Sequence, residues 1–591
     1  MPQKYEETQP DGRIAHFSNP EVWRLNPRRA GFQSPDSFTP RPFEGRGRGW
    51  GEFSRIFLPI LIGLCILALA PDLSARGQGP GNTLYLPLIS RPVSGPVLKW
   101  QKGGCYNSWC ETGWYSSPAV INIDGDPQAE IIASAYSLVA LDGQTGALQW
   151  RAGNTNNRTW PGIVLADIDK DGQDEIVIAQ SGPYVSAYRL DGTLKWQKQP
   201  SGAGGEYRGL LVSDLDNNGG PLEVIVTRAS GSETNTWVLN SSGNSIGGKW
   251  PQMSDGTGYA WGVYNANAAA GDLRPDIPGL ELVVPSDVHY INAYDKSGNQ
   301  LPANAVDYPG KGWGLVGVWE DLAIEKRGWG DCYDGSLPRA EHYRANFADG
   351  PAVIADVNGD GVREVVAAGN MYDCYAGYPP SRYYAPYIFN ADRSRFNASG
   401  FDWRSIPVDT GAPLSEDWQV IQSAGPNPVV ADLDGDGKQE ILFSSYDGRV
   451  HAYWLDKTEH GDWPYEVYKP SEGFIRFASE PVVADLDCDG KAEVLFTSWP
   501  PNDSGQTGKL YVASFNGQTL YEVNLPPAFG GGYNGALAAP TLANVDTDPD
   551  LEVVVNTIDS GVVVYDLPGT AGACRLQWPT GRGNYLRNAS R

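Results

Sequence analysis

The sequence predicts an all-β protein that folds as a single β-propeller of four-stranded blades. Eight times along the chain an apolar run breaks into a short acidic loop and resumes as a second apolar run, most clearly over residues 429–443. After several loops a third run with an Asp-Gly turn follows, and then a fourth that ends in Leu-x-Trp, as at residues 193–196. Four short strands in each unit of roughly 45–60 residues are typical of propeller blades, so the loops predict eight blades rather than seven.

The sixth acidic loop shows why these loops predict metal binding. Side-chain oxygens stand at positions 1, 3, 5 and 9, which are Asp432, Asp434, Asp436 and Glu440, and Gly437 permits the tight turn. Hard oxygens at alternating positions suit Ca²⁺, which takes about 6–8 oxygen ligands, better than Mg²⁺, which needs a stricter octahedron. An EF-hand begins similarly, but helices flank it and its glutamate falls later in the loop.

Six further loops keep closely related ligand sets, so calcium is predicted in up to about seven blades. Their predicted ligands, in chain order, are Asn122, Asp124, Asp126, Glu130; Asp167, Asp169, Asp171, Glu175; Asp214, Asp216, Asn218, Glu223; Asp356, Asn358, Asp360, Glu364; Asp485, Asp487, Asp489, Glu493; and Asn544, Asp546, Asp548, Glu552. The third of the eight loops carries one extra residue. The fourth, which begins at Asp272, has Arg274 at position 3, and we expect it to keep the turn but lose the metal.

The loops and their flanking strands resemble the FG-GAP or VCBS repeats of integrin α-subunit heads and of many secreted bacterial proteins. The resemblance covers about residues 97–578. It implies a propeller with calcium in several blades and a role in adhesion or ligand binding. The integrin-type head has one blade fewer than the loops found here. Because Leu98-Lys99-Trp100 also has the pattern of an outermost strand, the sequence leaves open how the ring closes.

Composition excludes several functional classes. The net charge of −25 argues against nucleic acid as a partner, because phosphate binding needs clustered Lys and Arg. Carboxylates of the acidic loops supply nearly all of this charge, so bound cations would offset much of it. The chain has five His, none of them paired at zinc-ligand spacing, and no P-loop, dinucleotide or Gly-x-Ser-x-Gly motif. The most easily recognised enzyme classes are thereby removed.

Residues 56–70 are an uncharged apolar segment that follows several arginines, which is the layout of a secretory signal. The segment is shorter than the roughly 17–25 residues of a membrane span. A cleaved signal peptide and an uncleaved signal anchor stay open, and both predict that the remainder is secreted or held at the cell surface. The predicted organisation is an N-terminal extension at 1–55, the signal segment at 56–70, a linker at 71–96, the propeller at 97–580 and a C-terminal tail at 581–591.

Cysteine usage agrees with export. Cys105 and Cys110 lie in one loop, and Cys332 and Cys374 lie in two insertions that a disulfide would join. Disulfides persist in oxidising compartments. The sequence assigns no partner to Cys488 or Cys574.

The spacing between loops widens around two insertions, at about 301–350 and 368–428. Their aromatic residues are Trp313, Trp319, Trp329, Tyr333, Tyr343, Tyr372, Tyr375, Tyr378, Tyr383, Tyr384 and Tyr387. These side chains either form a surface that stacks on sugar rings or covers a protein partner, or they pack the insertions onto the propeller. Nearby carboxylates such as Glu320 and Glu325 support no catalytic assignment, because proximity in sequence does not set their separation in space.

Three functional hypotheses follow. The first is an exported, calcium-binding and non-catalytic scaffold, a monomer that binds a protein or glycan ligand in adhesion. The alternative is a carbohydrate-active enzyme with its site in the aromatic insertions, since some polysaccharide lyases are calcium-containing eight-bladed propellers. A quinoprotein-like redox propeller is the third, suggested by the Leu-x-Trp strand ends, but no cofactor-binding set is visible in the sequence. We predict no catalytic residue and no organic cofactor.

Overall fold

The computed structural model divides the chain into two compact units, Met1–Leu84 and Tyr85–Arg591. It describes residues 6–8, 14–16, 94–103, 116–200, 202, 204–228, 234–254, 267–286, 289–326, 343–347, 350–373, 384–407, 414, 427–501, 504–528, 531–558, 561–570 and 574–591. In the first unit β1 (Glu6–Thr8) pairs with β2 (Ile14–His16). The predicted signal segment lies outside the described residues. Within them, no helix combines the length and apolarity that a membrane crossing requires.

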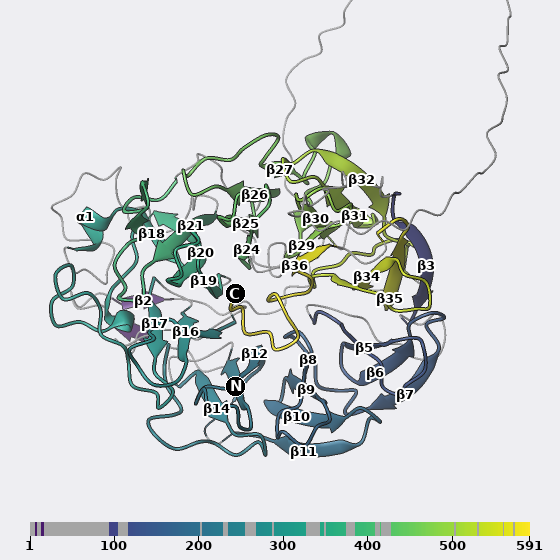
Figure 1. Ribbon diagram of the computed structural model, residues 1–591, viewed down its shortest axis with the longest axis horizontal. Coiled ribbons are helices and arrows are strands. Elements are labelled where there is room, and N and C mark those ends of the chain that lie inside the picture. The colour runs from purple at the N-terminus through teal and green to yellow at the C-terminus, as the bar shows by residue number, and fades with distance from the viewer. Residues whose placement is uncertain are drawn as a thin grey trace, which may run out of the picture. The chain divides into compact units, whose positions relative to one another are not determined.

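The second unit is a ring of eight antiparallel blades, which confirms the predicted fold class (Figure 1). Blades 1, 2, 6 and 7 each contain four consecutive strands, from the inner to the outer edge: β4 (Ala119–Ile121), β5 (Glu130–Ser134), β6 (Leu138–Asp142) and β7 (Leu148–Ala152); β8 (Val164–Ala166), β9 (Glu175–Gln180), β10 (Tyr184–Arg189) and β11 (Leu194–Lys198); β24 (Val429–Ala431), β25 (Glu440–Ser444), β26 (Arg449–Tyr453) and β27 (Tyr465–Glu466); β29 (Val482–Asp485), β30 (Glu493–Trp499), β31 (Lys509–Ala513) and β32 (Thr519–Asn524).

The other blades vary this plan. Their strands are β12 (Tyr207–Ser213), β13 (Glu223–Arg228) and β14 (Thr236–Leu239) in blade 3; β15 (Ala269–Gly271), β16 (Glu281–Pro285) and β17 (Ile291–Tyr294) in blade 4; β19 (Ala352–Ala355), β20 (Glu364–Asp373) and β21 (Tyr384–Phe389) in blade 5; and β33 (Thr541–Ala543), β34 (Leu551–Asn556), β35 (Val562–Leu567) and β3 (Val97–Lys102) in blade 8. Isolated bridges such as Thr236 to Gln252 and Tyr294 to Gln300 complete the outer edges of blades 3 and 4.

Short elements complete the second unit. They are β18 (Tyr343–Asn346), which pairs with β20; the hairpin of β22 (Asn397–Ala398) and β23 (Phe401–Asp402); β28 (Phe477–Ala478), which pairs with β30; β36 (Arg575–Trp578); the 3₁₀ turns η1 (Trp313–Leu315) and η3 (Pro470–Glu472); and the single-turn helix α1 (Leu322–Glu325).

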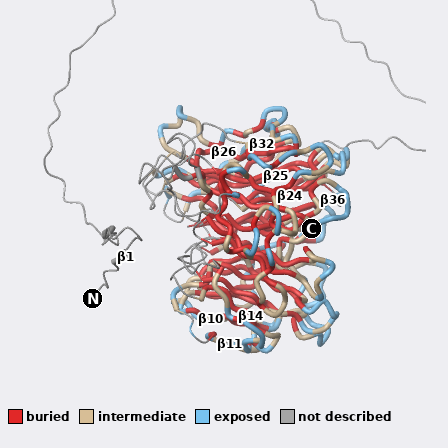
Figure 2. Tube along the Cα trace, turned by 90° about the vertical axis from the view of Figure 1, so that its left-hand side faces the viewer, coloured by how far each residue is buried: buried red, intermediate tan, exposed pale blue. Residues whose placement is uncertain are grey.

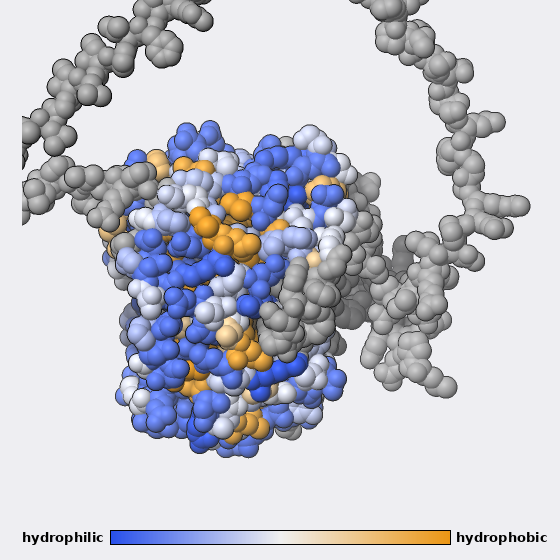
Figure 3. Space-filling view, turned by 90° about the vertical axis from the view of Figure 1, so that its right-hand side faces the viewer, coloured by the Kyte–Doolittle hydropathy of each residue, from blue (hydrophilic) through white to orange (hydrophobic). Residues whose placement is uncertain are grey.

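Burial falls from the inner to the outer strands of each blade. All six residues of β9 are buried, whereas β11 consists of exposed and half-buried residues. Figure 2 shows the same contrast between buried strand layers and exposed loops. On the face in Figure 3, small hydrophobic patches lie among hydrophilic atoms. Strands covered on both faces by neighbouring blades are near-continuous apolar runs, which explains why the sequence shows runs more often than alternation.

The tryptophans of the outer strands join successive blades. Trp100 Nε1 in blade 8 donates to the carbonyl oxygen of Gly143 in blade 1 at 2.8 Å. Trp196 in blade 2 donates in the same way to Ser241 in blade 3 at 2.8 Å. The same contact recurs from Trp250 to Lys296, from Trp403 to Leu455 and from Trp463 to Phe515. The Leu-x-Trp pattern therefore reports contacts between blades, and it needs no redox cofactor to explain it.

The first strand of the propeller closes the ring, because β3 pairs with β35 and forms the outer strand of blade 8. The sequence left this point open. Our interpretation of Arg575–Trp578 as a further outer strand is wrong: β36 pairs with β29, the inner strand of blade 7. A Leu-x-Trp pattern records which faces of a strand are apolar, and it does not specify the pairing partner.

Residues 579–591, most of which we expected to be a tail, lie inside the ring and contact the inner strands. The amide of Val212 in blade 3 donates to Leu586, and that of Ala270 in blade 4 donates to Asn588. Further hydrogen bonds reach blades 1, 2, 5, 6 and 8 through Val120, Leu165, Ile354, Val430 and Leu542. With β36 on blade 7, the segment 575–591, here called the central segment, contacts every blade.

Arg587 is the most heavily bonded side chain of the central segment. It is fully buried, and its guanidinium donates to the carbonyl oxygens of Ile163, Gly581 and Pro118 at 2.8, 2.7 and 3.0 Å. It also donates to Thr580 Oγ1 at 2.7 Å. Burial lowers the pKa of Arg587 to about 10, which leaves it protonated at neutral pH.

Cys488 and Cys574 form a disulfide. It links the acidic loop of blade 7 to the residue before β36, across a sequence separation of 86. Replacing both cysteines by serine should lower the free energy of unfolding by about 2–4 kcal/mol, because the bond restricts the unfolded chain. Urea unfolding of the double variant checks this, with the fully reduced wild type as control. An unchanged unfolding midpoint would contradict it.

Candidate metal sites

The glutamate that ends each acidic loop holds the loop closed. In every blade its Oε2 accepts the backbone N–H of the residue that follows the first ligand position, as between Leu486 and Glu493 at 2.8 Å. The other seven pairs are Ile123–Glu130, Ile168–Glu175, Leu215–Glu223, Leu273–Glu281, Val357–Glu364, Leu433–Glu440 and Val545–Glu552. The fourth loop keeps this bond, so it keeps the predicted turn.

Aspartates within the loops are also bonded to the backbone. In blade 7, Asp485 Oδ2 accepts from Gly490 N at 3.1 Å, and Asp489 Oδ1 accepts from Lys491 N at 2.8 Å. The same two bonds recur in blade 5 between Asp356 and Gly361 and between Asp360 and Val362. Backbone donors therefore fix the direction of these carboxylates before any cation binds.

The fixed carboxylates converge. Ligand oxygens from three residues lie within 4.8 Å of one another in sets that include Asp124, Asp126, Glu130; Asp167, Asp169, Glu175; Asp432, Asp434, Glu440; Asp485, Asp487, Asp489; and Asp546, Asp548, Glu552. The structure thus brings together most of the predicted ligands of these five loops. Several hard oxygens around one point fit Ca²⁺. Which loops bind a cation stays a prediction.

Without a cation, crowding shifts the titration of the loop glutamates. Burial raises the pKa of Glu440 to about 9, and the neighbouring Asp434 carboxylate adds to the rise. Burial likewise raises the pKa of Glu364 and Glu493 to about 8. A group whose pKa is higher in the folded than in the unfolded state stabilises the fold below its unfolded pKa, and this stabilisation is lost as pH rises through the folded value.

We therefore expect the metal-free propeller to lose stability as the pH rises from about 4.5 to about 9, and calcium to suppress this loss. Melting temperatures measured across this range, with chelator and with excess calcium, check the expectation. Glu440→Gln is the matched variant, because a neutral amide removes one titrating group and should flatten the chelator curve. A metal-free stability that is flat or that rises over this interval would contradict it.

Some loops contain cationic or neutral side chains. In the fourth loop Arg274 pairs with Asp276 at 2.7 Å, and its backbone N–H donates to Glu281 at 2.8 Å. Lysines from outer strands contact the loops of blades 2 and 8, and a glutamine contacts that of blade 1. Our sequence reasoning missed these contacts, although the middle residue of the Leu-x-Trp motif was visible in each case.

The aromatic insertions lie toward the face opposite the acidic loops. Each acidic loop joins the first and second strands of its blade, so the next connection, between the second and third strands, emerges on the other face. There β20 runs beyond its neighbours and pairs with β18. Trp313, Trp319, Tyr384 and Tyr387 are buried, as packing predicts. Trp329, Tyr333, Tyr375, Tyr378 and Tyr383 lie outside the described residues, as do Cys105, Cys110, Cys332 and Cys374.

The insertion carboxylates that the structure describes are structural. Glu325 is fully buried and pairs with Arg393 at 3.0 Å and with Arg395 at 2.6 Å. Burial by itself would raise the pKa of Glu325, but the two guanidiniums outweigh burial and lower it. Asp321 caps α1 by accepting from the backbone N–H of Ala323. Neither residue is placed to act on a substrate.

Comparison with known proteins supports the repeat assignment. The FG-GAP-like repeat family matches residues 432–496. Two curated relatives from Bacillus subtilis (strain 168) align with this chain: rhamnogalacturonan endolyase YesW, 26% identical over 372 residues, and rhamnogalacturonan exolyase YesX, 23% identical over 464 residues. These alignments cover 59% and 71% of this chain, but only 48% and 62% of the relatives. The chain thus matches about half to three fifths of their length.

Solved structures that resemble this one include the biofilm matrix protein Bap1 of V. cholerae, with a TM-score of 0.46 at 13% identity. That match covers 83% of this chain and 95% of Bap1. BamB from Moraxella catarrhalis has a TM-score of 0.39 at 13% identity, over 76% of this chain and 96% of BamB. The repeat match in blades 6 and 7 and the ring of eight blades identify the chain as an FG-GAP-repeat β-propeller protein.

Proposed function

We propose that this protein is an exported, calcium-stabilised propeller that binds a polysaccharide and acts as a non-catalytic scaffold. The alignment to two rhamnogalacturonan lyases carries the choice of ligand, because it extends well beyond a single repeat. A protein ligand was an equal expectation from the sequence, and no comparison supports it to the same degree. Rhamnogalacturonan contains uronate, so an acidic polysaccharide is the ligand class to test.

Calcium has a structural part in this proposal. The ions would be held by backbone-anchored carboxylates such as Asp485, Asp489 and Glu493, and they would neutralise clusters that otherwise repel one another. Export is supported by the Cys488–Cys574 disulfide and by the apolar segment at residues 56–70. The central segment fills the middle of the ring, so we place ligand binding on the face that carries the insertions.

Affinity electrophoresis in gels that contain rhamnogalacturonan tests the proposal, with a neutral glucan as the control polysaccharide. We expect retardation of the full-length protein only in the acidic polysaccharide, and loss of retardation after unfolding. Equal migration in both gels would contradict polysaccharide binding. A parallel run with chelator shows whether calcium acts on binding or only on stability.

A second candidate is a polysaccharide lyase, favoured by the names of the two relatives. Elimination requires a base that removes the proton next to the uronate carboxylate while the glycosidic oxygen leaves, and it yields an unsaturated sugar. Among the described histidines, His289 and His451 are buried, and His460 stacks on Trp454. Appearance of the ultraviolet-absorbing unsaturated product from rhamnogalacturonan would replace the scaffold proposal with the lyase.

A further inference from the structure

Four outer strands carry a β-bulge at the same place. In blade 2, Trp196 lies opposite Ala187 and Leu194 lies opposite Tyr188, so Lys195 is the extra residue. The same shift makes Gln149 the extra residue in blade 1, Lys99 in blade 8 and Leu520 in blade 7. A bulge redirects the side chain of its extra residue. In blades 1, 2 and 8 that side chain reaches the acidic loop of its own blade.

Lys195 stands among the carboxylates of blade 2. Its ammonium lies 2.6 Å from Asp169 Oδ2, 2.6 Å from Glu175 Oε1 and 3.6 Å from Asp171 Oδ2. These three residues are predicted calcium ligands. Because Glu175 Oε2 is already bonded to the backbone, the lysine takes the oxygen that faces the cluster.

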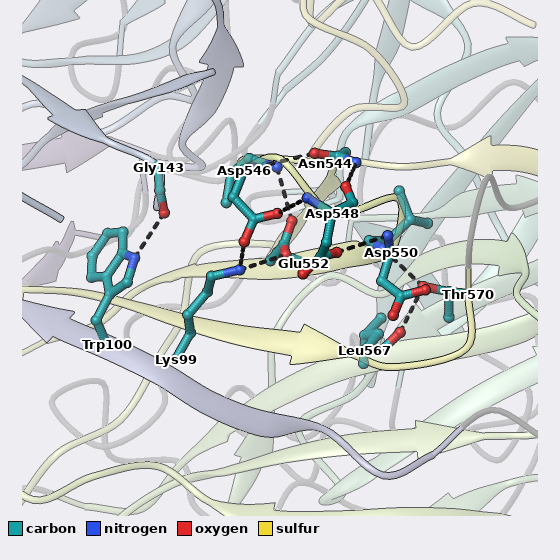
Figure 4. Close-up of polar contacts among 12 residues, drawn as sticks. Lys99, Trp100, Gly143, Asn544, Asp546, Asp548, Asp550, Glu552, Leu567 and Thr570 are labelled. Atoms are coloured by element: carbon teal, nitrogen blue, oxygen red, sulfur yellow. Dashed lines mark hydrogen bonds and ion pairs between the residues drawn. The ribbon is translucent and has the colours of Figure 1, made fainter. Parts of the chain in front are cut away.

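Lys99 repeats this arrangement in blade 8, although it comes from the other end of the propeller sequence. Figure 4 shows its ammonium between Asp546 and Glu552, with Asp548 close by. It pairs with Asp546 and lies 3.0 Å from Glu552 Oε1. Its side chain is 17% exposed and that of Lys195 is 14% exposed, so both are largely withdrawn from solvent.

The same bulge brings other chemistry to blades 1 and 7. Gln149 Nε2 donates to Glu130 Oε1 at 2.9 Å, which is the contact that lysine makes elsewhere, without the charge. In blade 7 the bulge residue Leu520 is partly exposed and supplies no charge. One position of the repeat therefore carries lysine, glutamine or leucine, and it differs between blades that have nearly the same acidic loop.

We propose that Lys99 and Lys195 are built-in counter-ions that stand where a divalent cation would bind, so that the loops of blades 8 and 2 close without calcium. This inference rests on the calcium binding of our proposed function and narrows it, because it excludes two loops with well-matched ligand sequences. An ammonium within hydrogen-bond distance of two ligand oxygens competes for them, and it also repels an incoming Ca²⁺.

Calcium titration with the full-length protein, followed by isothermal calorimetry and elemental analysis, tests the inference. We expect Lys99→Leu and Lys195→Leu each to gain about one calcium per molecule, because the carboxylates then need another cation. The reverse change, Leu520→Lys in blade 7, should lose about one calcium or weaken one site at least about tenfold. Leu520→Gln, which copies blade 1, and Lys438→Met, which removes an exposed lysine of loop 6 outside any bulge, should keep the wild-type count.

The outcomes separate this inference from the proposed function. If the wild type binds calcium and neither lysine variant gains any, the inference is overturned while calcium binding stands. If the wild type binds none and the lysine variants do, the inference stands and the calcium of the proposed function fails. A lysine variant that folds only with calcium supports the inference. If neither lysine variant folds, Leu520→Lys decides, and its retention of every wild-type site at full affinity overturns the inference.

Discussion

Deleting residues 579–591 should leave no cooperatively folded propeller. These residues supply hydrogen bonds to the inner strands of seven blades, and the deletion would leave amides such as those of Val212 and Ala270 without partners in the centre of the ring. Each buried polar group left unsatisfied costs about 1–3 kcal/mol, so the loss exceeds the total stability of about 5–15 kcal/mol of an ordinary domain. Circular dichroism and size-exclusion chromatography measure the outcome.

A single substitution tests the same claim more finely. Arg587→Met keeps much of the side-chain volume but removes every donor to the carbonyl oxygens around it, so we expect a loss of about 3–5 kcal/mol. Arg189→Met is the control, because Arg189 is exposed on β10 and should change stability by less than about 0.5 kcal/mol. Equal unfolding midpoints for the two variants would contradict the role given to the central segment.

Removal of calcium is the second large effect. We expect a chelator to lower the melting temperature substantially, because every occupied site contributes about 2.7 kcal/mol when free calcium exceeds the dissociation constant about 100-fold. Loss of the ions also leaves clustered carboxylates, such as Asp485, Asp487 and Asp489, without a counter-ion. Differential scanning calorimetry of the stripped and calcium-loaded protein checks this.

The control for this experiment is magnesium at the same ionic strength. Magnesium should restore little of the lost stability, because it requires a stricter octahedron than these loops supply. Full restoration by any divalent cation would indicate general charge screening. A melting temperature that does not move with chelator would show that the acidic loops are turns without bound metal.

The blades and acidic loops could be predicted from the sequence because both are local. Strand length, apolar runs and the spacing of Asp, Gly and Glu are set within about twenty residues. Even the failure of the ligand pattern at Arg274 was visible there. Within the described residues, the loop-ending glutamates occupy the same structural position in all eight blades.

What could not be predicted depends on partners far apart in the chain. Arg575–Trp578 has the pattern of an outer strand and pairs with an inner one. The partner of Cys488 is separated from it by more than a blade. Lys99 meets Glu552 only because the ring closes through β3. The aromatic residues illustrate a further limit, since composition does not reveal that Trp313 and Trp319 are buried.

The central segment changes how the repeats share stability. In an open repeat array each unit interacts with its neighbours alone, so stability is close to a sum of nearest-neighbour terms and one end can fray without the other. Here a single stretch of 17 residues, 575–591, contacts all eight blades. Fraying of any one blade then weakens a segment that the other seven also use, which couples distant blades directly. The expected behaviour is all-or-none unfolding of the whole ring in place of stepwise loss from an end.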